Sequence, residues 1–453
     1  MSDQLAQFEG LLRDIQSFSS LGIRPGMERV TRLLSRLGSP EKAFPAIHVL
    51  GTNGKGSTAA TLESVCEAAG IRTALYTSPH LSSLRERLRV GKKHVDITIW
   101  RDAFKRVMKA VDDDSPDTVR PTFFENLTAL AFLAMSESCA DVAIIEAGMG
   151  GRYDATSACR AVATVITPIG MDHMEYLGDT IQAIAGEKFA AIKGGVSAFY
   201  AGDDEALSAQ FAERCDSAGA PHFLMNRIAR PRNIRCTLGG TSFDYVRLNP
   251  EDGPPTVGLE TPLIGIHQSY NASNAVTALL ELRKTVPLFG RIGEAQIRRG
   301  LAAVDWPGRM EICRPGPDAP MILLDGAHNE HGFTALVKSL SLLRESGQIS
   351  GVGAVVFAVM RDKDMTGIAR LLKRLSSPVF PTRLAMTRSR PADDLATLLE
   401  KAGCETRGVW EDPASALAAA IAATDPGGLV VCCGSLFLVG AMRDLLPSFG
   451  KSA

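Results

Sequence analysis

A glycine-rich segment that joins a strand to a helix is the feature that most constrains the fold of this chain. Residues 51–58 read GTNGKGST, follow the apolar run Ala46–Leu50 and lead into a helical pattern over residues 57–69. Glycines allow the backbone to turn until several N–H groups face inward, and the helix N-terminus and Lys55 add positive charge. The segment therefore predicts a loop for the phosphates of a nucleotide, although it departs from the strict GxxxxGK[ST] pattern. The alternative is a plain glycine-rich turn that happens to contain a lysine.

Short apolar runs alternate with helical patterns along most of the chain, which predicts a parallel sheet covered by helices. The predicted strands are 46–50, 73–76, 141–145, 161–167, 321–324, 354–359, 384–387 and 429–433. The alternation breaks between about residues 230 and 262, where Gly239-Gly240 predicts a β-hairpin. We therefore predict an α/β protein with a large domain over residues 1–299, which includes this small β insertion, and a second α/β domain over residues 300–453.

The charge balance and the cysteines exclude several classes of protein. Lys and Arg number 49 and Asp and Glu number 50, so the chain lacks the excess positive charge of a general nucleic-acid binder. Neither uncharged stretch, 261–280 or 426–442, supplies the about 20 mainly apolar residues of a membrane span. Residues 1–18 carry acidic side chains and no apolar core, and the nine cysteines form no CxxC pair. We expect a cytoplasmic enzyme with reduced thiols, without a secretory signal and without nucleic-acid or membrane partners.

Polar side chains follow three further strands of the first domain. Ser78, Glu146 and His173 each come at or shortly after the end of a predicted strand. Because ligands bind outside the carboxyl ends of the strands in an open parallel sheet, we expect these side chains to converge near the phosphates. Hydroxyl and carboxylate oxygens suit Mg²⁺, whereas imidazole is a less usual ligand. Each residue alone also fits a turn, a cap or a loop, and their common position favours a metal site.

Longer motifs run through nearly the whole chain. In order, they are HVLGTNGKGST, YTSPHLSSLRERLRV, TFFE, EAGMGGRYDATS, GMDH, GEKFAAIK, HQSYNASNA, WPGRME, DGAHN and GSLFLVG. In this order and spacing the chain resembles the folylpolyglutamate synthase/dihydrofolate synthase family of Mur-type ligases, in its bacterial bifunctional form. The resemblance implies a P-loop Mur-ligase central domain, a Rossmann-like C-terminal domain and a monomer. It also implies ATP-driven amide formation, in which a substrate carboxylate takes the γ-phosphoryl group and the amino group of L-glutamate then displaces phosphate.

The resemblance implies the residues of the ATP and metal sites. The residues around ATP would be Gly54, Lys55, Gly56, Ser57, Asn271, Arg309 and Asp325. Asn271 would contact adenine, Arg309 the phosphates and Asp325 the ribose. The ligands of Mg²⁺ would be Ser78, Glu146 and His173. Lys188 matches a lysine that is often carbamylated in the family, and its carbamate would hold a second Mg²⁺. The residues implied in catalysis are Lys55, His173, Lys188 and Arg309.

The substrate sites are implied in the same way. The positions that match contacts to dihydropteroate are Arg24, Pro25, Gly26, Thr122, Phe124, Glu125, Asp154 and Ala155, and the positions that match the L-glutamate site are His328 and Ser435. The chain departs from the family twice, with Phe189-Ala190-Ala191 where EK is commonly followed by AGI, and with Ser157 in place of the asparagine of DATN. From the residues alone, Lys188 also fits a solvated helix lysine, Asn271 a helix N-cap and Phe124 a core aromatic.

Three functions compete on this basis. The first is a ligase that adds L-glutamate to dihydropteroate and to reduced folates, two reactions that use the same machinery. The second is a Mur-type ligase for another carboxylate, which the TFFE and DATS segments disfavour. The third is a nucleotide-hydrolysing P-loop switch protein, against which the chain has no Asn-Lys-x-Asp motif for guanine. The motifs favour the first function.

Overall fold

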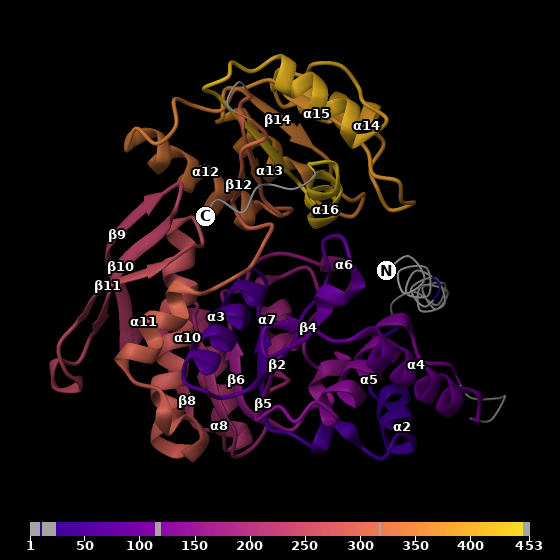
Figure 1. Ribbon diagram of the computed structural model, residues 1–453, viewed down its shortest axis with the longest axis vertical. Coiled ribbons are helices and arrows are strands. Elements are labelled where there is room, and N and C mark those ends of the chain that lie inside the picture. Colours follow the sequence, from indigo (N-terminus) through magenta and orange to yellow (C-terminus); the bar gives the residue numbers. More distant parts are fainter. Residues whose placement is uncertain (1–9, 11–23, 114–118, 317–318, 447–453) are drawn as a thin grey trace.

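The computed structural model describes residue 10 and residues 24–113, 119–316 and 319–446, so most of the segment 1–18 that was analysed for a secretory signal lies outside the described residues. Two α/β bodies lie one above the other, each built on its own sheet (Figure 1). The larger body is formed by the first part of the chain and the smaller body by the last third. The predicted α/β class with two mostly parallel sheets is confirmed.

An eight-stranded sheet forms the centre of the larger body, in the order β4-β3-β2-β5-β1-β6-β7-β8. The strands are β1 (Ala46–Leu50), β2 (Thr73–Tyr76), β3 (Leu88–Val90), β4 (Lys93–His94), β5 (Val142–Glu146), β6 (Ala161–Ile166), β7 (Ser197–Tyr200) and β8 (His222–Leu224). All neighbours pair in parallel except at β3 and β4, which run antiparallel at one edge. Strand β1, which leads into the glycine-rich segment, therefore lies in the interior of the sheet between β5 and β6.

Successive residues of β1 and β5 point to opposite faces of the sheet, and each face has its own core. On one face Ala46 and Ile145 pack with helices α2 (Glu28–Arg36), α4 (Ile97–Asp112) and α5 (Phe123–Ser136). On the other face Ile47 and Ile144 pack with α3 (Lys55–Ala68), α10 (Ile266–Thr285) and α11 (Glu294–Ala302). Beyond β6, helices α7 (Ile181–Phe189) and α8 (Glu205–Ala218) cover the sheet, and the short helices are α6 (Met174–Leu177) and α9 (Met225–Ile228).

A three-stranded antiparallel sheet interrupts the larger body where the alternation breaks. Its strands are β9 (Ala229–Thr237), β10 (Gly240–Arg247) and β11 (Thr256–Thr261). The turn between β9 and β10 is formed by Leu238 and Gly239, one residue before the predicted Gly239-Gly240 pair, and Gly240, the first residue of β10, has a φ of +141°. A Cβ on Gly240 would lie 2.2 Å from the carbonyl oxygen of Thr261, so the close approach of the strands requires glycine there. The predicted hairpin is confirmed and extended by a third strand.

The smaller body is a five-stranded sheet in the order β12-β13-β16-β14-β15. Its strands are β12 (Glu311–Cys313), β13 (Met321–Leu324), β14 (Ala354–Phe357), β15 (Val379–Pro381) and β16 (Leu429–Cys433). Its helices are α12 (Glu330–Glu345), α13 (Met365–Lys373), α14 (Ala392–Lys401), α15 (Pro413–Ala422) and α16 (Leu436–Leu445). The predicted strand 384–387 is wrong, because the chain pairs earlier, at β15. Strand β15 ends in Pro381. A proline is tolerated there because β15 is the edge strand of the sheet.

The chain passes between the two bodies after α11. This helix packs against α3 of the larger body, and the second sheet begins only at Glu311. Residues 308 and 310 are already hydrogen-bonded to the smaller body, through Gly326 and Asp325. We therefore propose residues 303–307 as the crossing segment, slightly later than the predicted boundary at 299/300. All nine cysteines lie in the described ranges and are free, in keeping with the expectation of reduced thiols. Among the helices of the described ranges, none is both long and apolar enough to cross a membrane.

The contact between α3 and α11 generates a stability prediction. A Cβ on Gly300 would lie 2.5 Å from the Cα of Val65, a backbone atom that moves only if the helices separate. Replacing a helical glycine by alanine normally stabilises by about 1 kcal/mol, but overpacking costs about 1–3 kcal/mol and more when backbone must shift. We expect Gly300→Ala to lower the midpoint of urea unfolding.

Gly290→Ala is the matched control, because nothing lies within 4 Å of a Cβ there and the residue is exposed. A Gly300→Ala midpoint equal to or above that of the natural chain would show that the two helices do not approach as closely as described.

Candidate functional site

The glycine-rich loop closes tightly over the carboxyl end of β1. The φ angles are +133° at Gly51 and +86° at Gly54, which side chains of L-residues rarely allow. A Cβ on Gly51 would lie 1.9 Å from Oγ1 of Thr167, and one on Gly54 would lie 2.5 Å from Oδ1 of Asn271. The loop leads directly into α3, so its N–H groups and the positive end of a long helix face the same point. This arrangement suits the phosphates of a nucleotide.

The three predicted metal ligands come from both sides of β1. Ser78 follows β2 and Glu146 ends the neighbouring strand β5, whereas His173 comes after β6 on the other side of β1. Lys55 lies close enough to Glu146 and His173 to influence the pKa of both. The backbone N–H of Ser78 donates to Oε2 of Glu146 at 3.2 Å. Burial raises the pKa of Glu146, and the charges of Lys55 and Arg309 oppose that rise. Burial lowers the pKa of His173 to about 4, so its imidazole is neutral near pH 7 and free to bind a cation. A hydroxyl, a carboxylate and a neutral imidazole fit a divalent cation that also takes oxygens from phosphate.

Within the described ranges no group of three or more His, Cys, Asp or Glu side chains gathers for a metal. A cation at this edge of the sheet would therefore depend on the Ser78 hydroxyl and on oxygens that a nucleotide brings. This is the usual situation of Mg²⁺, which keeps several non-protein ligands.

Lys188 is buried in α7 rather than solvated. Its side chain donates from Nζ to the carbonyl oxygen of Gly51 at 2.9 Å. Burial, with a further contribution from Lys55, lowers the pKa of Lys188 to about 7, so much of the amine is neutral at physiological pH. The family departure at Phe189 is accommodated in the core, where this ring packs edge-on against Tyr200 with centroids 5.4 Å apart. The alternative interpretation as an ordinary surface lysine is wrong.

The smaller body faces this edge of the sheet with Arg309 and Asp325. The guanidinium of Arg309 lies close enough to Asp325, Glu146 and His267 to influence the pKa of all three. Asp325 is buried at the end of β13 and accepts hydrogen bonds from the backbone N–H groups of Met310 at 2.9 Å and Ala327 at 2.8 Å. Burial raises the pKa of Asp325, and Arg309 opposes that rise. One cation therefore links carboxylates of both bodies.

Asn271, His328 and Ser435 are the remaining residues predicted for the nucleotide and glutamate sites. Asn271 lies in the second turn of α10 and donates to Oε1 of Gln268 at 3.0 Å. It is not the helix N-cap, which is Gly265, so that alternative is wrong. His328 contacts the carbonyl oxygen of Gly326 through Nδ1 at 2.7 Å, and its Nε2 lies 3.6 Å from Oδ2 of Asp172. Ser435 caps α16 and is buried.

The residues predicted for dihydropteroate gather where α2 meets α5. Thr122 and Glu125 cap α5 reciprocally, with the Thr122 N–H donating to Oε2 of Glu125 at 2.6 Å. Arg29 pairs with Glu125 at 2.9 Å and donates to the carbonyl oxygen of Arg24 at 2.5 Å, which ties the segment Arg24-Pro25-Gly26 to this helix. Phe124 is half-buried and stacks near Tyr76, with ring centroids 6.5 Å apart. An accessible ring at this position suits a flat aromatic ligand.

Asp154 is held at the bottom of the same region. Its carboxylate is buried and accepts from the N–H of Met149 at 2.7 Å and from the N–H of Thr156 at 3.0 Å. Burial raises the pKa of Asp154, and these hydrogen bonds oppose the rise. Ala155, the next residue, is also buried. Ser157, the second family departure, donates to the carbonyl oxygen of Gly151 at 2.6 Å and so closes the loop that carries Asp154.

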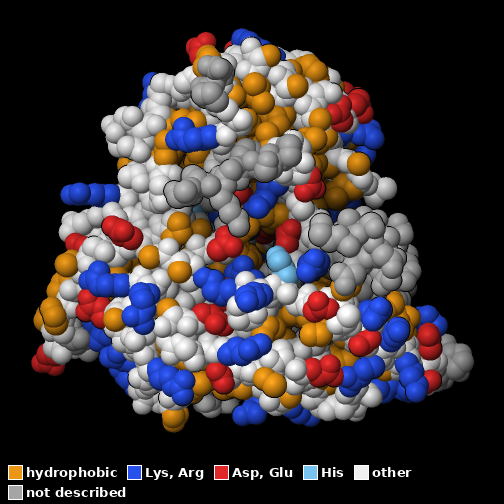
Figure 2. All heavy atoms as spheres, in the orientation of Figure 1, with side chains coloured by type: hydrophobic (Ala, Val, Ile, Leu, Met, Phe, Trp, Pro, Cys, Tyr) orange, Lys and Arg blue, Asp and Glu red, His pale blue; other side chains and the backbone are white. Residues whose placement is uncertain are grey.

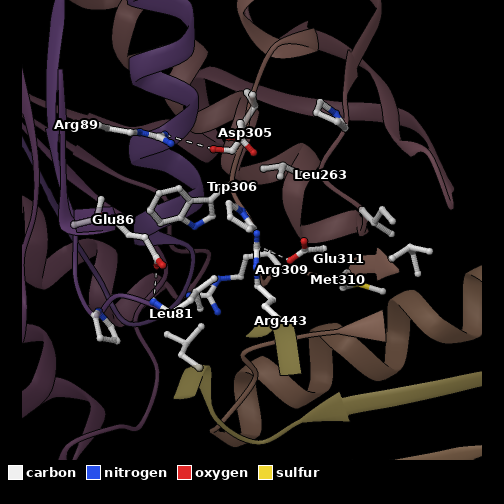
Figure 3. A pocket seen from close by; sticks show the side chains of 18 of the residues that line it. Leu81, Glu86, Arg89, Leu263, Asp305, Trp306, Arg309, Met310, Glu311 and Arg443 are labelled. Carbon is white, nitrogen blue, oxygen red and sulfur yellow. Dashed lines mark hydrogen bonds and ion pairs between the residues drawn. The ribbon is translucent and has the colours of Figure 1, made fainter. Parts of the chain in front are cut away.

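A cavity of about 530 Å³ lies between the two bodies. Ser78 and Glu146 of the larger body line it together with Arg309, and Trp306 and Arg89 lie on the same wall (Figure 3). Figure 2 shows charged side chains of both signs and a histidine where the molecule is hollowed between its two parts. The cavity thus reaches two of the three predicted metal ligands, Ser78 and Glu146, from the junction of the two bodies, whereas His173 is not part of its lining.

Comparison with known proteins agrees with this geometry. The Mur ligase middle domain matches residues 49–279, and the Mur ligase glutamate ligase domain matches residues 308–436. The dihydrofolate synthase/folylpolyglutamate synthase of Bacillus subtilis is 32% identical over 429 residues, which cover 94% of this chain and 96% of the relative. The chain belongs to the folylpolyglutamate synthase/dihydrofolate synthase family of Mur ligases. The predicted family is therefore confirmed.

Solved structures of this family share the fold over their whole length. The Escherichia coli FolC protein in complex with DHPP and ADP is 27% identical, covers 97% of each chain and has a TM-score of 0.82. A bifunctional folylpolyglutamate synthase/dihydrofolate synthase with Mn, AMPPNP and L-glutamate bound is 26% identical, with 96% of this chain and 98% of that chain covered and a TM-score of 0.80.

A polar network that joins the two bodies of this folylpolyglutamate synthase family member was missed by sequence reasoning. Lys363 of the smaller body pairs with Oδ1 of Asp172 at 2.6 Å, and Asn329 donates to Oδ2 of the same carboxylate at 3.0 Å. Asn53 of the phosphate loop donates to Oδ1 of Asn329 at 2.9 Å and contacts Nδ1 of His331 at 2.8 Å. Lys363 comes shortly after the end of β14. Ser78 and Glu146 were predicted because they follow or end strands, and the same reasoning applied to the second sheet would have identified Lys363.

The low pKa of Lys188 generates a prediction on the pH dependence of stability. Between pH 7 and about 10.5 the unfolded chain holds a proton on this amine and the folded chain does not, so the free energy of unfolding rises with pH across this window. We expect Lys188→Met, in bicarbonate-free buffer, to be more stable than the natural chain at pH 7, by an amount on the order of a few kcal/mol. This advantage should shrink steadily toward pH 10.

Lys338→Met, at an exposed position of α12, is the matched control and should leave the slope of stability against pH unchanged. Urea unfolding at a series of pH values measures both variants. Parallel curves for Lys188→Met and the natural chain would mean that the amine stays charged in the folded protein.

Proposed function

We propose that this chain is an ATP-dependent ligase that joins L-glutamate to 7,8-dihydropteroate and also to tetrahydrofolate, through an acyl-phosphate intermediate. The observation that supports the proposal is the cavity between the two bodies, which Ser78 and Glu146 line together with Arg309. Lys55 lies near Glu146, and Asp325 lies near Arg309. A ligase needs such a meeting point, because a nucleotide, a carboxylate acid and an amine must be held together while water is excluded. A switch protein would not need a second body with matched residues.

The first chemical step joins two anions. The substrate carboxylate attacks the γ-phosphorus of ATP, the bond to the β-phosphate oxygen breaks, and ADP leaves. Lys55 and the N–H groups of the loop would bind the phosphates, and Arg309 would approach them from the opposite side, so that repulsion between the anions is reduced. Ser78, Glu146 and His173 would hold Mg²⁺, which when bound supplies further charge neutralisation at the phosphate oxygens.

The second step forms the amide. The neutral amino group of L-glutamate attacks the acyl carbon, the tetrahedral intermediate collapses, and inorganic phosphate leaves with the C–O bond electrons while the amine loses a proton. His328 and Ser435 would orient the incoming amino acid. The guanidinium of Arg309, which lies close enough to Asp325 to influence its pKa, would supply donors beside the reacting groups. Fixed donors of this kind stabilise the developing oxyanion without reorganisation.

We infer that Lys188 becomes carbamylated. Its neutral Nζ would add to the carbon of CO₂ with loss of one proton, which turns a cationic side chain into an anionic oxygen ligand for a second Mg²⁺. The burial of Lys188 and its pKa of about 7 support this step, because only the neutral amine reacts. The new negative charge would also relieve the repulsion that Lys55 exerts on this side chain.

Dihydropteroate would bind between α2 and α5, with Phe124 against the pterin and Asp154 and Ala155 at its polar edge. Thr122 and Glu125 would shape this site through the cap of α5, and the segment Arg24-Pro25-Gly26 would close it. We also propose that the protein acts as a monomer in the cytoplasm, where ATP and reducing conditions coexist and free cysteines persist.

A coupled assay of ADP release tests the proposed function. We expect release that requires both L-glutamate and a pterin acid, with 7,8-dihydropteroate and tetrahydrofolate both accepted. Arg309→Ala, which removes the cation between the two bodies, should reduce turnover at least about a hundredfold without changing the unfolding midpoint.

ADP release that is independent of both substrates would instead favour a switch protein. Release with a different carboxylate, but with neither pterin, would favour another Mur-type ligase.

Replacement of Lys188 tests the carbamate. We expect Lys188→Ala to lower turnover by about two to three orders of magnitude, and a short-chain carboxylic acid such as acetate to restore part of it by supplying the missing oxygen ligands. Lys55→Ala is the matched control, because an added anion does not replace a cation at the phosphates. Full activity of Lys188→Ala in plain buffer, or equal rescue of both variants, would reject the role.

A further inference from the structure

The segment that crosses between the two bodies is fastened to α3 and β3 by side chains to which no role has been assigned. Lys92 donates from Nζ to the carbonyl oxygen of Ala303 at 2.5 Å and to Oγ of Ser64 at 3.2 Å. Ser64 in turn donates to the carbonyl oxygen of Gly300 at 2.7 Å. The end of α11 and the start of the crossing segment therefore cannot shift relative to α3 without breaking a buried hydrogen bond from Ser64 and an exposed one from Lys92.

The strongest of these attachments is an ion pair between α3 and β3. Arg89 binds Glu63 with two hydrogen bonds, from Nε to Oε1 at 3.0 Å and from an Nη to Oε2 at 2.5 Å. The Glu63 side chain is 0% exposed and that of Arg89 only 10%. A bidentate pair of this kind fixes the plane of the guanidinium. The same guanidinium reaches the carbonyl oxygen of Asp305 at 3.4 Å, so the ion pair extends to the crossing segment.

Trp306 lies between this ion pair and the phosphate loop. The centre of the Arg89 guanidinium is 5.5 Å from the centroid of the indole ring, within the range of a cation–π contact. On the loop side, a Cβ on Gly56 would lie 2.6 Å from Cζ2 of Trp306, so the ring rests directly on the first turn of α3. Figure 3 shows Arg89, Asp305, Trp306 and Arg309 along one wall of the cavity.

The chain between Trp306 and Arg309 is short and stiff. Pro307 has a restricted φ, and the N–H of Gly308 donates to Oε2 of Glu311 at 2.8 Å. The N–H of Gly326 donates to the carbonyl oxygen of Gly308 at 3.1 Å. A displacement of the indole relative to Gly56 would therefore be passed on to Arg309 rather than absorbed.

We propose that Trp306, held on the guanidinium of Arg89, is a positioning residue that sets Arg309 at the correct distance from the phosphate loop. The inference rests on the proposed function, because Arg309 is taken to act on the phosphates of ATP. Trp306 itself touches the helix that follows the loop and not the reacting atoms. Its contribution is geometric: a shift of about 1 Å in a charged group at a reacting phosphate can cost as much as a hundredfold in rate.

A double-mutant cycle separates this role from a general loss of packing. The variants are Trp306→Ala, Arg309→Ala and the double variant, and the measurement is the Kd of AMPPNP with Mg²⁺, which requires no turnover. We expect each single variant to weaken binding about tenfold and the double variant to bind no more than about twofold more weakly than Arg309→Ala. In the natural Arg309 background, Trp306→Ala should also lower kcat for ADP release.

The conservative variant Trp306→Phe should recover most of the affinity, because phenylalanine keeps an aromatic face for Arg89. Trp410→Ala is the matched control: this tryptophan is bound through Nε1 to the carbonyl oxygen of Arg407 in the smaller body, and its loss should leave the Kd unchanged. If Trp306→Ala does not fold, Trp306→Phe and Arg89→Lys enter the same cycle, with smaller but still non-additive effects.

If the natural chain binds AMPPNP normally and the Kd of the double variant rises by the product of the two single increases, the two residues act independently. That result would overturn the positioning role of Trp306 and leave the proposed function intact. A natural chain that binds AMPPNP without any glutamate-dependent ADP release would overturn the proposed function and leave the coupling of Trp306 to Arg309 standing.

Discussion

The rest of the site depends on the close approach of positive groups at the carboxyl end of the larger sheet, of which Lys188 is buried and Lys55 and Arg309 are half-buried. Lys55 helps burial to lower the pKa of Lys188, and Arg309, from the smaller body, lies close enough to Glu146 to influence the pKa of that carboxylate. Such a cluster repels itself in a site of low dielectric constant. Buried carboxylates such as Glu146 offset only part of the repulsion, so a polyanion that arrives with a divalent cation is favoured. The loop needs glycine for a separate reason, because a Cβ on Gly51 would meet Thr167 and a Cβ on Gly54 would meet Asn271.

The two bodies divide the chemistry between them. The larger body holds the glycine-rich loop, the candidate metal ligands and the residues around the start of α5 that are proposed for the pterin, whereas the smaller body brings Arg309, Asp325 and Lys363. Contacts across the junction, above all Lys363 with Asp172, place His173 beside groups from a segment almost 200 residues later in the chain. In the proposed function both bodies surround the nucleotide, so turnover would depend on the distance between them. The crossing segment would therefore set the position of Arg309 as well as connect the two bodies.

Local patterns predicted most strands, and the exceptions have physical causes. Residues 384–387 are apolar enough for a strand, but the preceding residues of β15 pair with the sheet instead. Strand β15 was not predicted because it ends in a proline, which is rare inside sheets. Asn271 was open to interpretation as a helix cap because its neighbours are polar, yet α10 begins earlier, at Ile266. Lys188 was open to interpretation as a surface lysine because burial of one side chain depends on helices packed from elsewhere. Helix limits and exposure are properties of the packed molecule.

The sequence by itself determined the family, the two α/β layers, the phosphate loop and the strand-end positions of Ser78, Glu146 and His173. It could do so because the turn of a glycine loop and the period of a buried strand are encoded in consecutive residues. Only the tertiary structure decided the pKa of Lys188, the network around Asp172 and the seating of Trp306 on Gly56. These arise from desolvation and from contacts between segments far apart in the chain, and both depend on how the two bodies pack.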